Sequence, residues 1–120
     1  MTFDQYQQLA LRTAKHFNHL ETDLVHAALG IATEGGEFTT NVKRAAIYDK
    51  PIDEKMRGEL VEELGDLMWY VALACSKLGE RLELVCQWNI EKLQKRFPTI
   101  YSDQAAEARA DKGGLDWKES

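Results

Sequence analysis

Apolar residues recur along most of this chain at alternating steps of three and four positions, the spacing that places side chains on one face of an α-helix. The alternation with a period of two that would indicate strands is absent. Two long segments, residues 22–45 and 53–78, carry the helical pattern most clearly. Their predicted core positions are Leu24, Ala28, Ile31, Gly35, Phe38, Val42 and Ala45 in the first, and Met56, Leu60, Leu64, Leu67, Val71, Cys75 and Leu78 in the second.

Capping residues predict where the first two helices begin. The segment Thr2-Phe3-Asp4-Gln5 has the form of a capping box, which opens a first helix that frays near residues 16–19. Thr22 and Asp23 are both good N-caps, so a second helix is expected to begin there.

Turn-forming residues predict the remaining boundaries. Residues 48–52 form a turn around a proline, and Asp53 is placed to cap the third helix. Gly79 is placed to end that helix, and a fourth is expected over residues 80–96, before Pro98. The chain is therefore predicted to be all-α, with a four-helix bundle-type fold.

A row of carboxylates borders each of the two central stripes. Glu34 and Glu37 lie three residues apart, as do Glu63 and Asp66, so each pair occupies one helix face, one turn apart. Glu62 falls further round, towards solvent. Because two antiparallel helices would bring four like charges together, a hard divalent cation, Mg²⁺ or Mn²⁺, is expected to offset their repulsion.

Histidine is missing where other metal chemistries would need it. A di-iron carboxylate site would require histidine at positions 37 and 66, which are Glu and Asp. A zinc hydrolase would require histidine or cysteine ligands; His16 and His19 have suitable spacing but no third ligand nearby, so they are interpreted as surface residues. An all-oxygen site favours Mg²⁺, which commonly shares its coordination with substrate phosphates. Metal-dependent hydrolysis of a phosphoanhydride is the chemistry that fits best.

Two further features each allow two interpretations. Gly35 and Gly36 interrupt a helix at roughly 1 kcal/mol each relative to alanine. They indicate a tight helix crossing, access for a ligand, or both. Asn89, Lys92 and Arg96 share one face of the fourth helix. Asn89 also interrupts the apolar seam predicted for this helix, so its amide is expected to join a hydrogen-bond network or to face a polar cavity. The three residues either present an amide and two cations to one ligand or form a solvated helix edge favoured by the helix dipole.

Composition narrows the class of protein. A chain of 120 residues is one domain, and its net charge of −5 argues against nucleic acid as the main partner. No segment has the length and apolar character of a membrane span, and the N-terminus lacks a signal-peptide pattern. Cys75 and Cys86 lie in apolar helical patterns and are expected to be reduced thiols. These features predict a soluble, cytoplasmic protein that contacts no membrane.

The sequence motifs carry a resemblance to a known family. Residues 28–38 and 62–70 together look like the E-x-x-E … E-x-x-D signature of MazG-like all-α nucleoside triphosphate pyrophosphohydrolases. Residues 89–98 are similar to the family's closing N-x-x-K-L-x-x-R-[FY]-P segment. The resemblance covers roughly residues 2–101, so we expect a helical catalytic domain over 1–101 and a polar tail over 102–120, with a short helix at 103–110. Thr33 departs from the family, where many members have a second glutamate.

The resemblance implies Mg²⁺-dependent hydrolysis of a nucleoside or deoxynucleoside triphosphate to the monophosphate and pyrophosphate. Carried over residue by residue, it assigns the metal to Glu34, Glu37, Glu63 and Asp66, one of which, or Glu62, would activate water. Tyr70 matches a nucleotide contact, and a homodimer or homotetramer is expected to complete the site. The candidates for phosphate or base contacts are Asn89, Lys92 and Arg96, and more weakly Lys43 and Arg44.

Two other functions remain open at this point. One is a catalytically silent helical dimer that binds nucleotides or a protein partner. The other is an enzyme for a different phosphoanhydride, such as phosphoribosyl-ATP. Turnover under divalent ions and a substrate panel would separate the three.

Overall fold

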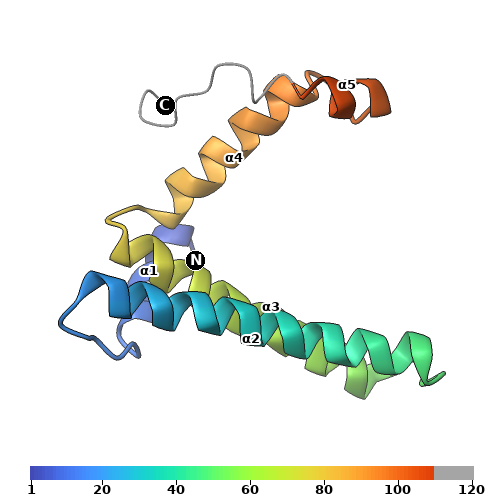
Figure 1. Cartoon of the computed structure of the whole chain (residues 1–120), viewed down its shortest axis with the longest axis horizontal. Helices are drawn as coiled ribbons and strands as arrows, with labels where there is room; N and C mark the ends of the chain where they lie inside the picture. The colour runs from blue at the N-terminus through green and yellow to red at the C-terminus, as the bar shows by residue number, and fades with distance from the viewer. Residues whose placement is uncertain (110–120) are drawn as a thin grey trace. The chain divides into compact units, whose positions relative to one another are not determined.

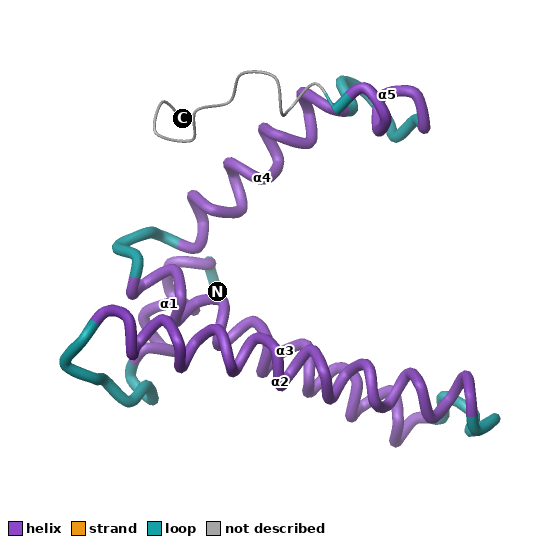
Figure 2. The backbone as a smooth tube through the Cα atoms, viewed as in Figure 1, coloured by secondary structure: helices purple, strands orange, loops and turns teal. Residues whose placement is uncertain are grey.

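The computed structural model of the chain describes residues 1–109. Within that range it contains helices and no strand, which confirms the all-α prediction (Figures 1 and 2). The helices are α1 (Phe3–Leu11), α2 (Leu20–Ile47), α3 (Glu54–Lys77), α4 (Leu82–Arg96) and α5 (Asp103–Ala108).

The described chain divides into two compact units. The first covers residues 1–82 and holds α1, α2 and α3; the second begins at Glu83 and holds α5 and nearly all of α4. In the first unit, α2 and α3 run side by side as an antiparallel hairpin, and α1 packs on α3 (Figure 1). This hairpin carries both acidic pairs.

The predicted capping box opens α1. The Thr2 hydroxyl accepts the backbone N–H of Gln5 at 3.1 Å, and the Gln5 side chain accepts the backbone N–H of Thr2 at 2.8 Å. A reciprocal pair of this kind satisfies two of the N–H groups that a helix end leaves without partners.

The start of α2 differs from the prediction. The helix begins at Leu20 with His19 at the N-cap, rather than at Thr22 or Asp23. Asp23 is buried instead, where it accepts the backbone N–H of Phe17 at 3.0 Å and pairs with Lys77 at 3.5 Å. Because a buried carboxylate needs partners, tertiary contacts gave this residue a role that its local capping preference did not predict.

The turn between α2 and α3 follows the prediction. Asp49 adopts a positive φ of 52°, and the Asp53 carboxylate caps α3 by accepting the backbone N–H of Met56 at 2.9 Å. The cap is worth about 1 kcal/mol.

The packed face of α2 lies closer to the acidic row than the apolar stripe predicted. Ala28 and Val42 are exposed, whereas Ala27, Gly30 and Asn41 are buried. Gly30 is a position of close approach, because a Cβ built there would overlap the ring of Tyr70. Small residues let α3 come near on this face, which draws the acidic row into the seam between the helices.

Gly35 and Gly36 are not a close crossing within the described chain. A Cβ added at either position meets nothing within 4 Å, so the predicted tight contact falls at Gly30 instead. The alternative interpretation, that these glycines leave space for a ligand, remains a prediction.

Gly79 ends α3 as predicted, with a φ of +74°. The N–H of Glu80 donates to the carbonyl of Cys75 at 2.8 Å and that of Gly79 to the carbonyl of Ser76 at 3.0 Å, which together form a Schellman motif. Because Glu80 takes part in this motif, α4 begins at Leu82, two residues later than predicted.

Gln7 holds the two ends of this turn to α1. Its buried amide donates to the Ser76 hydroxyl at 2.8 Å and to the Glu80 carbonyl at 2.9 Å, and its oxygen accepts the N–H of Leu82 at 2.8 Å. The side chain thereby satisfies backbone groups that would otherwise be buried without partners.

The second unit is less extensive. Ser102 caps α5 through the N–H of Ala105, and Arg109 ends it in the left-handed conformation. The helix is therefore shorter than the predicted 103–110, and the predicted Lys112-Gly113-Gly114 segment lies outside the described residues.

Two predictions from composition can also be compared with the structure. Cys75 is buried and Cys86 partly buried, and neither forms a disulfide within residues 1–109. Among the described residues, the helices are too short or too polar to traverse a lipid bilayer.

Candidate active site

Three of the four predicted metal ligands come together in the hairpin. Glu34 and Glu37 on α2 and Glu63 on α3 each offer a carboxylate oxygen, and these oxygens all lie within 4.8 Å of one another. The i, i+3 spacing stacks the first two on one helix face, and the antiparallel pairing brings the third opposite them. Glu34 and Glu63 are half-buried and Glu37 is exposed, so the group opens to solvent on one side.

Two oxygens of this group lack hydrogen-bond partners. Oε2 of Glu34 and Oε2 of Glu63 are fully enclosed, and within residues 1–109 neither accepts a hydrogen bond. A buried carboxylate oxygen without a donor is costly, and a bound cation is one of the few groups that can satisfy it. The donor set therefore fits a metal ion.

The neighbouring carboxyl groups raise the pKa of Glu63. It rises from its ordinary value of 4.5 to about 7, chiefly because a hydrogen bond to the carboxylate of Glu34 favours the protonated form of Glu63. Burial and the carboxylate of Glu37 raise it further. In the metal-free protein near neutral pH, a proton partly offsets the repulsion that a cation would otherwise relieve.

The chemistry of the donors limits the identity of that cation. All three are carboxylates, which suit hard ions such as Mg²⁺ and Mn²⁺ rather than zinc. No other group of three or more metal-binding side chains occurs among the described residues, and His16 instead accepts a hydrogen bond from Lys77 at 2.8 Å. Mg²⁺ held by carboxylates keeps open positions for substrate phosphates.

Asp66, the fourth predicted ligand, lies outside this close group. It is exposed one turn beyond Glu63, and its charge, together with burial as the larger cause, raises the pKa of Tyr6 on α1. Glu62 is also exposed. Their predicted roles as metal ligand and water-activating group stay predictions.

Tyr70 stands at one end of the acidic seam, in an aromatic group. Its ring packs edge-on against His26 at 5.8 Å and Trp69 at 4.9 Å, with Gly30 beneath it. The indole N–H of Trp69 donates to the Ala10 carbonyl at 3.2 Å and to the Thr13 hydroxyl at 3.0 Å. Trp69 therefore anchors α1 to α3, while Tyr70 occupies the next turn after Asp66.

The predicted phosphate contacts divide between the two units. Asn89, Lys92 and Arg96 lie on α4, in the second unit, and Asn89 is exposed rather than buried in a seam. Lys43 and Arg44 are exposed on α2, with Lys43 placed 5.9 Å from the ring of Tyr48. Whether the residues of α4 face the carboxylates stays a prediction.

Three residues near the site were missed by sequence reasoning. Tyr6 and Asn41 were given no role from the sequence, yet burial and the charge of Asp66 raise the pKa of Tyr6, and Asn41 is buried on α2. His26 carries no motif, yet its Nδ1 is enclosed without a partner in the described chain and its ring packs between Phe17 and Tyr70. Only the tertiary packing of α1 and α2 against α3 identifies them.

The described chain is thus an all-α protein in which an antiparallel helical hairpin gathers three glutamates. Two of their oxygens are enclosed without a partner, and the donor set fits a cation. Comparison with known proteins gives the family. Residues 25–101 match the model of the MazG nucleotide pyrophosphohydrolase domain, so the chain belongs to that family.

A phage protein supports the same assignment. The chain is 37% identical over 102 residues to the Gene 37 protein of Mycobacterium phage L5, an overlap that covers 80% of this chain and 89% of that protein. No solved structure matches the chain.

Proposed function

We propose that this protein hydrolyses a nucleoside or deoxynucleoside triphosphate, with Mg²⁺, to the monophosphate and pyrophosphate. The observation that carries the proposal is the group of Glu34, Glu37 and Glu63, in which two enclosed oxygens have no hydrogen-bond partner in the described chain. Membership of the MazG family supports the reaction class.

The reaction balances as a hydrolysis. Water attacks the α-phosphorus, the bond from that phosphorus to the oxygen bridging the β-phosphate breaks, and the bonding pair leaves with pyrophosphate. The proton from water passes to a carboxylate and then to solvent. A bound Mg²⁺ supplies charge stabilisation for the phosphoryl oxygens and lowers the pKa of a nearby water.

The chain's own residues divide the work in this proposal. Glu34, Glu37 and Glu63 hold the cation, Asp66 completes the set, and Glu62 or one of the four positions the attacking water. Tyr70 contacts the nucleoside. Asn89, Lys92 and Arg96 of α4 contact phosphates or base, and a second subunit completes the pocket in a homodimer or homotetramer.

A substrate panel tests the reaction. Each common ribo- and deoxyribonucleoside triphosphate is incubated with the protein and Mg²⁺, and pyrophosphate and monophosphate are quantified. We expect the two products in equal amounts from at least one substrate. Orthophosphate as the sole product, or binding without turnover under any divalent ion, would contradict the proposal; phosphoribosyl-ATP in the same panel tests the other phosphoanhydride.

Glu37→Gln tests the carboxylate group. Mutating a residue that only orients a metal ligand typically lowers metal affinity or activity by about 10–100-fold. Loss of a ligand itself should therefore lower kcat/KM by more than about 100-fold. Glu37 is exposed, so the melting temperature should change little. Glu21→Gln, at an exposed glutamate in the first turn of the same helix, is the matched control and should retain full activity.

A further inference from the structure

The seam between α2 and α3 has chemically different ends on either side of the glutamates. Gly30 opposite Tyr70 marks the aromatic end, and Glu34, Glu37 and Glu63 follow. On α2 the same row then continues through Asn41 to Arg44, at steps of four and three residues from Glu37. Those steps keep all three side chains on one helix face, towards the turn that joins the helices.

A cavity of about 330 Å³ lies at that turn. Its lining includes Arg44 from α2, Lys50 from the turn and Lys55 from α3, together with Asp53 and Glu59. The carboxylate of Asp53 is engaged as the cap of α3. Glu59 is therefore the principal charge opposing an anion among three cations.

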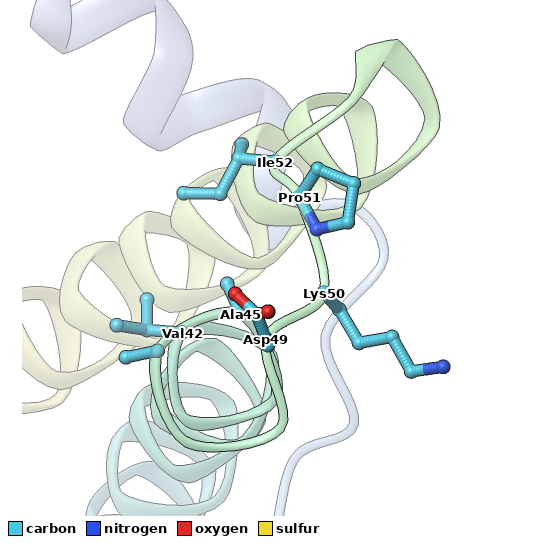
Figure 3. A pocket seen from close by; sticks show the side chains of 7 residues that line it. Val42, Ala45, Asp49, Lys50, Pro51 and Ile52 are labelled. Atoms are coloured by element: carbon cyan, nitrogen blue, oxygen red, sulfur yellow. The ribbon is translucent and has the colours of Figure 1, made fainter.

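The three cations are free to take a ligand. Among residues 1–109, their side chains form no ion pair and no side-chain hydrogen bond. Lys50 also lines the neighbouring pocket together with Val42, Ala45 and Ile52, but its side chain extends away from theirs, as Figure 3 shows. Its ammonium group is therefore kept out of apolar surroundings.

Asn41 lies on the same face of α2, between the glutamates and the cavity. It is one turn from both Glu37 and Arg44 and is 9% exposed. Its side-chain amide makes no hydrogen bond within the described part of the chain and is not among the fully enclosed polar groups, so it can still be reached by a ligand. A group spanning from the glutamates to the cavity would pass it.

The spacing between Glu37 and Arg44 along α2 suits a group that spans from the glutamates to the cavity. Seven residues separate Glu37 from Arg44, about 10 Å along the helix axis. The Cα–Cβ bond of Arg44 tilts towards the N-terminus of α2, and so towards the glutamates. Arginine is also the side chain best suited to bind phosphate through two parallel N–H groups.

We infer that the cavity of Arg44, Lys50 and Lys55 is the subsite for the β- and γ-phosphates of the substrate and for the pyrophosphate released from them. This inference rests on the proposed triphosphate hydrolysis and gives it a direction along the hairpin. The nucleoside lies towards Tyr70, the scissile bond at the glutamates, and the leaving group at the turn.

The test compares two double variants with equal change in charge. Arg44→Gln/Lys55→Gln removes two lining cations. Lys15→Gln/Arg57→Gln removes two exposed cations that lie outside this lining and have no proposed contact with the substrate. Inhibition by inorganic pyrophosphate, inhibition by the nucleoside monophosphate and KM for the triphosphate are measured with Mg²⁺ for both variants and the wild type.

The lining variant should weaken pyrophosphate inhibition at least about tenfold, because it loses two charge-assisted contacts at an exposed site. Its KM for the triphosphate should rise by a similar factor. Monophosphate inhibition should stay within about twofold, because the nucleoside end lies elsewhere. The control variant should behave as wild type. Glu59→Gln should tighten pyrophosphate inhibition, since it removes the opposing charge. Equal pyrophosphate inhibition in the lining and control variants would overturn the inference.

Calorimetric titration of pyrophosphate and of orthophosphate, with Mg²⁺, separates this inference from the proposed function. An inactive wild type whose pyrophosphate binding depends on Arg44 and Lys55 would contradict the hydrolase and retain the subsite. An active wild type that binds pyrophosphate independently of both residues would retain the hydrolase and overturn the subsite. No activity and no binding would overturn both.

Discussion

At the scale of single residues, the candidate site is a balance of charges. Glu34, Glu37 and Glu63 share a space where all three cannot be ionised without cost, and the raised pKa of Glu63 is the measure of that cost. A bound metal ion and a bound proton each reduce the repulsion between these carboxylates, so they compete for the same oxygens.

The metal-free protein should therefore lose stability as pH rises from 4.5 to about 7. In this window the folded state holds a proton on Glu63 that the unfolded state has released, so the free energy of unfolding falls with pH. Thermal unfolding in chelator, for wild type and Glu63→Gln, checks this. The melting temperature of the wild type should fall relative to that of Glu63→Gln as pH rises from 4.5 to about 7, and Mg²⁺ should reverse this fall. A constant difference between the two melting temperatures would contradict the raised pKa of Glu63.

At the scale of helices, one glycine sets the approach of α2 to α3. The ring of Tyr70 occupies the space that a Cβ at Gly30 would take, whereas the corresponding space at Gly36 is open in the described chain. The two glycines lie on the same helix, so they form a matched pair for testing helix packing against helix propensity.

Gly30→Ala should destabilise the protein by about 1–3 kcal/mol through overpacking, in spite of the helix propensity gained. Gly36→Ala should stabilise it by about 0.5–1 kcal/mol, since nothing opposes the added methyl group. Urea unfolding at equilibrium measures both. A destabilising Gly36→Ala would show that another surface contacts this position in solution, and a neutral Gly30→Ala would contradict the close approach of Tyr70.

At the scale of the whole molecule, the described core is thin. Leu73 and Leu82 are the large side chains that are fully buried among residues 1–109. The hairpin meanwhile leaves a large set of apolar side chains exposed on both helices. They include Val25, Leu29 and Val42 on α2, and Val61, Leu64 and Met68 on α3.

We expect these exposed residues to be covered by a second copy of the chain. Apolar surface of this extent is rarely left in water by a protein of this size. Sedimentation velocity should give a dimer or tetramer at micromolar concentrations, and Leu29→Glu/Leu64→Glu should shift it towards monomer with helicity retained. A wild-type monomer that retains full activity would contradict the expectation that a second subunit completes the site.

Much of this arrangement could be predicted from local patterns. The helices, the Thr2 and Asp53 caps, the Gly79 stop and the stacking of Glu37 one turn from Glu34 depend on spacing along the chain, which helix geometry converts directly into position. Asp23, Gly30 and Asn41 could not be predicted, because their roles depend on which helix lies opposite. The apolar stripe on α2 indicated a seam displaced from the observed one, since periodicity identifies an amphipathic face but not its partner. Sequence spacing thus established the acidic pairs, and the antiparallel packing of α2 on α3 established which of those acids meet, what encloses their oxygens and where the cations of the turn lie.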